Sequence, residues 1–160
     1  MARKVFRRGV TVTSTTLADI GEIGDYRTVG DKKYRLVYTS ASLASSGVAA
    51  VLTLESQQTW EVRKISVAET EPVWGVNATG ASVPALSYLW AMVDGPLTIS
   101  SAMTGSNVIA ANQAITMAAG EVFITWLSTT TTPNPCGTAL QSLASDGSTP
   151  IVIHFKGQGA

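Results

Sequence analysis

The residue types that carry most enzyme chemistry are scarce in this chain, which has one histidine, His154, and one cysteine, Cys136. A zinc site of histidine and cysteine ligands therefore cannot be assembled within a single chain. His154 lies in an alternating run, residues 151–156, on the face opposite Ile153 and Phe155. We expect it to be a half-exposed sheet residue rather than a catalytic base. Cys136 could act as a nucleophile only beside a base, and we interpret it as a small buried or loop residue.

Two acidic residues, Glu69 and Glu71, flank Thr70 and point to the same side of the chain if it is extended. Such a pair can serve acid–base or metal chemistry, although both stand in a loop before Pro72, where solvated carboxylates are common. An enzyme would use this pair or Asp94, and would need them in one cleft. The sequence has no G-x-S-x-G elbow, phosphate loop, dinucleotide fingerprint or H-E-x-x-H motif. We therefore predict a protein that is not an enzyme and that needs no cofactor or metal.

Tryptophan and asparagine offer two binding or modification chemistries. The four tryptophans could stack against sugar rings, but each lies in a run with strand character, which favours core or interface packing; they are Trp60, Trp74, Trp90 and Trp126. Asn77-Ala78-Thr79 matches a glycosylation sequon. The lone cysteine suggests folding in a reducing cytosol, where that match has no meaning.

The stretch that must organise these residues is 86–99, in which two apolar runs flank Asp94-Gly95-Pro96. Asp-Gly between β-forming residues predicts a tight hairpin, with Pro96 at the start of the second strand. Alternate residues of the first run are apolar on both faces, so we expect that strand to be buried on both sides.

Other short runs with strand character recur every ten to fifteen residues, separated by Gly, Pro and Ser. A single helical turn is possible at residues 136–143. No apolar repeat of 3.6 residues is sustained, so the pattern predicts an all-β fold, a compact β-barrel or β-sandwich with short strands and an extended N-terminal arm. We expect strands at residues 34–39, 48–54, 60–67, 73–78, 108–117, 121–127 and 151–156.

Charge is sparse, at 14% of 160 residues, and unevenly placed. Residues 1–40 hold eight basic and four acidic residues, and the remainder holds three basic and seven acidic. We predict an extended basic arm over residues 1–30, whose Arg3, Lys4, Arg7 and Arg8 bind an anionic surface, and a β-domain over residues 31–160. A solvated terminus is the alternative. No apolar run approaches the ~20 residues of a membrane span, so we expect no membrane partner.

Five segments together resemble the small capsid decoration, or cement, proteins of tailed phages. The resemblance extends over about residues 31–156, and the chain departs from the family pattern in a Thr- and Pro-rich loop at residues 128–135 and in a longer arm. The segments are YRLVY at 34–38, VWGVN at 73–77, YLWAMVDGPL at 88–97, AAGEV at 118–122 and GTAL…DG…IVI at 137–153.

This resemblance implies a structural virion protein, made in the host cytoplasm and placed on the outer surface of the capsid. There it would bridge and stabilise major capsid protein subunits as a homotrimer, without catalytic residues and without direct contact with nucleic acid. Sparse charge suits such large interfaces. A carbohydrate-binding or adhesion β-module of a phage particle is the alternative, and an exposed aromatic platform would favour it.

Overall fold

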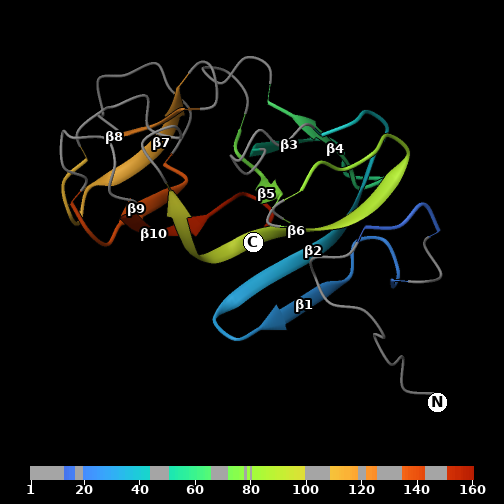
Figure 1. Ribbon diagram of the computed structural model, residues 1–160, viewed down its shortest axis with the longest axis horizontal. Helices are drawn as coiled ribbons and strands as arrows, with labels where there is room; N and C mark the ends of the chain where they lie inside the picture. The colour runs from blue at the N-terminus through green and yellow to red at the C-terminus, as the bar shows by residue number, and fades with distance from the viewer. Residues whose placement is uncertain are drawn as a thin grey trace.

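The computed structural model confirms an all-β fold, with strands and no helix among the described residues (Figure 1). The structure describes residues 13–16, 20–43, 51–65, 72–77, 79, 81–99, 109–118, 122–125, 135–142 and 151–160. The strands are β1 (Tyr26–Val29), β2 (Lys32–Thr39), β3 (Val51–Ser56), β4 (Glu61–Lys64), β5 (Gly75–Asn77), β6 (Ser87–Ile99), β7 (Ala114–Ala118), β8 (Val122–Thr125), β9 (Gly137–Ala139) and β10 (Ile151–Lys156).

The pairing of the strands closes a ring, in the order β2, β4, β3, β5, β6 and back to β2. All these pairings are antiparallel except that of β2 with β4, where Tyr38 lies opposite Glu61 in parallel register. The ring is a small barrel, on one side of the molecule in Figure 1. A second set of strands, β10, β9, β7 and β8, continues the sheet from β6 on the other side.

Strand β6 joins the barrel to the second set of strands. The prediction of a hairpin at residues 94–96 is wrong, because the strand continues through these residues. Its first half pairs with β2 up to Asp94, and its second half pairs with β10 from Asp94 onward. Tyr34 lies opposite Met92 and Lys33 opposite Asp94, so Val93 is an extra residue in β6, a bulge. Gly95, at φ +127°, then turns the strand toward β10 without reversing it.

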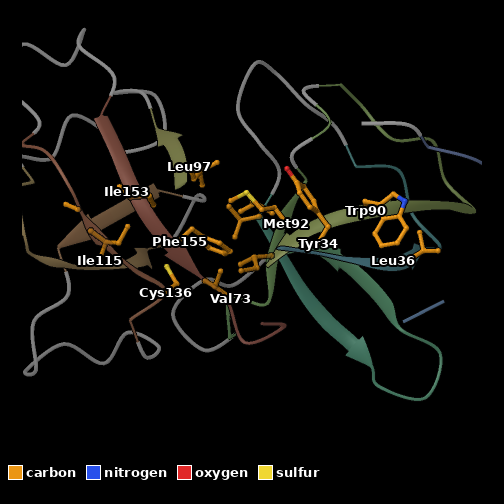
Figure 2. Close-up of a cluster of buried hydrophobic side chains, with 14 of the residues drawn as sticks. Tyr34, Leu36, Val73, Trp90, Met92, Leu97, Ile115, Cys136, Ile153 and Phe155 are labelled. Atoms are coloured by element: carbon orange, nitrogen blue, oxygen red, sulfur yellow. The ribbon is translucent and has the colours of Figure 1, made fainter. Parts of the chain in front are cut away.

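The predicted burial of β6 on both faces is confirmed, because residues 89–93 are at most 1% exposed. Leu89, Ala91 and Val93 face the barrel interior, where they pack with residues such as Val37 and Leu52. Trp90 and Met92 face outward into the other apolar cluster, which includes Tyr34, Leu97, Ile153 and Phe155 (Figure 2). The outer wall of the barrel and the inner face of the second set of strands thus share one core.

The predicted helical turn at residues 136–143 is also wrong, because residues 137–139 form strand β9. That strand pairs with β7 and β10, placing Thr138 opposite His154. Gly137 permits the pairing, since a Cβ there would lie 2.5 Å from the carbonyl oxygen of His154.

Part of the segment expected to form the arm, residues 1–30, packs against its own chain. Ser14 forms a two-way backbone bridge with Tyr88, and Ile20 is 4% exposed within the core. Strand β1 pairs with β2 along its whole length. Residues 20–30, which the sequence analysis placed in the arm, therefore pack within the described fold.

Candidate functional site

Lys33, His154 and Lys156 surround Asp94, at the junction between the barrel and the second set of strands. Lys33 of β2 places Nζ 3.0 Å from Asp94 Oδ2, and His154 of β10 places Nε2 3.1 Å from Asp94 Oδ1. Lys156 lies directly opposite Asp94 in the β6–β10 register. The bend in β6 is what brings these three strands to one carboxylate.

The charges around Asp94 favour its ionised form. Partial burial acts to raise the pKa of Asp94, but the hydrogen bond and charge of Lys33, with the charges of His154 and Lys156, outweigh it, and the pKa is lowered. Asp94 is therefore a carboxylate at neutral pH, and a paired carboxylate is a poor general acid or base.

A His–Asp pair becomes a catalytic device when the histidine also contacts a nucleophile. The contact described for His154 is the one with Asp94. The thiol of Cys136 lies in the core, on the opposite face of the sheet, and burial raises its pKa to about 12. The pair consequently acts as a contact between strands β10 and β6, and Cys136 is the buried residue that the sequence predicted.

His154 is half-exposed, as predicted, with 53% of its side chain accessible. The candidate carboxylates Glu69 and Glu71 lie outside the described residues, as do the arm residues Arg3, Lys4, Arg7 and Arg8. Their proposed roles stay predictions.

The sequon asparagine and two of the tryptophans are buried structural residues. Asn77 is 1% exposed; its Nδ2 donates to the carbonyl oxygen of Ala81, and its Oδ1 accepts from the backbone N–H and hydroxyl of Thr79. The asparagine of the sequon therefore closes a local turn. Trp74 and Trp90 are buried, as expected, and Trp126 lies outside the described residues.

Trp60 belongs to a stack that sequence reasoning missed. The Arg35 guanidinium lies 3.6 Å from the ring centroid of Tyr26 and 4.3 Å from that of Trp60, and its Nη1 donates to the carbonyl oxygen of Gly24. This arrangement covers one face of Trp60 with a cation and leaves that face unavailable to a sugar ring. Tyr26, Arg35 and Trp60 come from separate strands and turns, so no local sequence motif predicts that they stack.

Comparison with known families found no matching family model, and no curated protein matches the sequence. Within the described ranges, no group of three or more His, Cys, Asp or Glu side chains could hold a metal ion. The same part of the chain contains no helix long and apolar enough to cross a membrane.

Proposed function

We propose that this protein is a capsid decoration protein, a structural component of a tailed-phage head that bridges major capsid protein subunits from outside the shell. The observation that carries the proposal is the placement of the segments that resemble that family. Residues 34–38 lie in β2, residues 73–77 enter and form β5, and residues 88–97 lie in β6. These three strands are neighbours, since β6 pairs with both β2 and β5.

Three glycines of these segments, Gly75, Gly95 and Gly137, lie close to neighbouring backbone. A Cβ at Gly75 would lie 3.0 Å from the carbonyl oxygen of Met92, and one at Gly95 would lie 2.7 Å from that of Asp31. Gly137 has the similarly close contact with β10 described above. The resemblance therefore rests on residues that this fold requires, which supports reading it as a likeness of architecture.

A bridging role needs surfaces rather than a cleft. Each contact with a further coat subunit adds to avidity, because it is effectively intramolecular once the first contact is made. Exposed apolar side chains at Tyr26, Val29, Leu86 and Leu140 are available for such contacts. We propose a homotrimer, as the resemblance implies.

The test is to purify phage particles that carry this protein and to quantify it by mass spectrometry against the major capsid protein. We expect a fixed ratio, retained through density-gradient sedimentation, and rebinding of recombinant protein to particles stripped of it. Protein that washes off and does not rebind would refute the bridging role. Light scattering should give about 50 kDa, three times 16.7 kDa, for the homotrimer; a stable monomer would refute assembly before capsid binding.

A further inference from the structure

Basic side chains from β2 and β10 are grouped around Asp94 on the solvent face of the sheet. Alternation along β10 places Ile153 and Phe155 in the core and His154 and Lys156 outside. Lys33 of β2 and Lys156 of β10 both lie directly opposite Asp94, one on each side of β6. We name Lys33, His154 and Lys156 the cationic sheet face.

The one carboxylate among these cations is set back from the surface. Asp94 is 15% exposed, whereas Lys33 and His154 are 54% and 53% exposed. Each of its oxygens contacts one of those two side chains, so the carboxylate fixes their position while their outer parts remain open to solvent. A second carboxylate brought from outside would meet cations that are already oriented.

The charged residues that the structure describes beside this group do not cancel its charge. Asp31, in the β1–β2 turn, and Lys32, the first residue of β2, carry opposite charges and lie close to Gly95. Thr138 of β9 lies opposite His154 and is uncharged. Lys33, Lys156 and Asp94 together carry a net positive charge, although residues 41–160, which include Lys156 and Asp94, are net negative in sequence.

We propose that the cationic sheet face docks a carboxylate-rich extended segment of a partner protein. Lys33 and Lys156 are two strand spacings apart, about 10 Å, which two acidic side chains of one extended segment can reach together. The neighbouring surface is apolar or hydroxylic, with Pro96 and Val152 half-buried and Leu140 51% exposed. That mixture suits a peptide, whereas nucleic acid binding relies on a larger run of phosphate contacts. The inference holds whether or not the partner is a capsid subunit.

Binding at this face depends on the exposed charges of Lys33 and Lys156. An acidic segment therefore binds more weakly as salt screens these charges.

The test is a titration of the ¹⁵N-labelled full chain with a hexaglutamate peptide at low salt, followed by NMR. We expect amide shifts centred on β10 and on the second half of β6. Lys156→Gln should weaken binding about threefold, as for the loss of an exposed ion pair. Raising the salt concentration should weaken binding to the unmodified chain. Lys64→Gln, an exposed lysine on β4 in the barrel, is the matched control and should change nothing.

Three outcomes would overturn the proposal. Shifts confined to residues 1–8 would assign the acidic peptide to the basic arm. Equal weakening by Lys64→Gln would show attraction to overall charge instead of to this face. Stronger shifts of the same amides by a short DNA duplex would assign the face to phosphate. Unchanged spectra of the free variants show that each has kept its fold.

Discussion

Replacing Gly95 by alanine should be among the most damaging single-methyl changes in this protein. Gly95 has φ +127°, and its new Cβ would lie 2.7 Å from the carbonyl oxygen of Asp31 and 2.9 Å from Cα of Lys32. Strained backbone costs about 1–3 kcal/mol, and overpacking against atoms that cannot rotate away costs about another 1–3 kcal/mol. We expect Gly95→Ala to lower the free energy of unfolding by about 4 kcal/mol, or Tm by about 8–16 °C.

Gly30→Ala is the matched control. Gly30 also has positive φ, +61°, but a Cβ there would meet no atom within 4 Å, so only the backbone term of about 1 kcal/mol applies. Urea unfolding followed by tryptophan fluorescence measures both, because Trp90 is 1% exposed in the folded state. Equal losses in the two variants would refute the close approach of the β1–β2 turn to β6. Gly95→Ala that is insoluble beside a folded Gly30→Ala would support it.

We also predict how stability or reactivity depends on three other side chains. The pKa of Asp94 is lowered in the folded protein, so its ionised side chain stabilises the fold above the ordinary pKa of 3.8. This stabilisation is lost as pH falls through the folded pKa. Asp94→Asn should therefore lower the free energy of unfolding by about 1 kcal/mol at pH 7 and by almost nothing near pH 2, as measured by urea unfolding. Cys136, with a pKa of about 12, should resist thiol reagents at pH 8 until the protein unfolds, and Cys136→Ser should cost about 1–3 kcal/mol by burying a hydroxyl; rapid labelling of folded protein would contradict this. Arg35→Lys should cost about 1 kcal/mol and shift Trp60 fluorescence, because lysine cannot stack as a plane between two rings; an unchanged spectrum would contradict the stack.

The parts of the fold that the sequence predicted are those set by alternation within one strand. Residues 34–39 and 151–156 form strands as expected, and the doubly apolar run 89–93 is buried on both faces. Burial of every second residue is a local property of a pleated strand, so it can be read without knowing the partner strand.

The candidate site could be predicted only in part, because its geometry depends on pairing between distant segments. His154 was expected to be half-exposed, and it is. Its contact with Asp94 joins residues sixty positions apart, and Lys33 reaches the same carboxylate from a third strand. Only the register of β2, β6 and β10 places them together, and register follows from the whole core.

The segment 94–96 shows why turn chemistry alone was insufficient. A hairpin and a bulged, bent strand both require a glycine at positive φ and both tolerate a proline beside it, so the three residues carry the same signal for either. The choice depends on which strand pairs with Leu97. Folding back would bring it against residues 86–93, whose edge already pairs with β2, whereas β10 offers Ile153 directly opposite and Phe155 two residues further along. The continuous strand buries both in the shared core, and this burial, available only once residues 151–156 are present, outweighs the local preference for a turn.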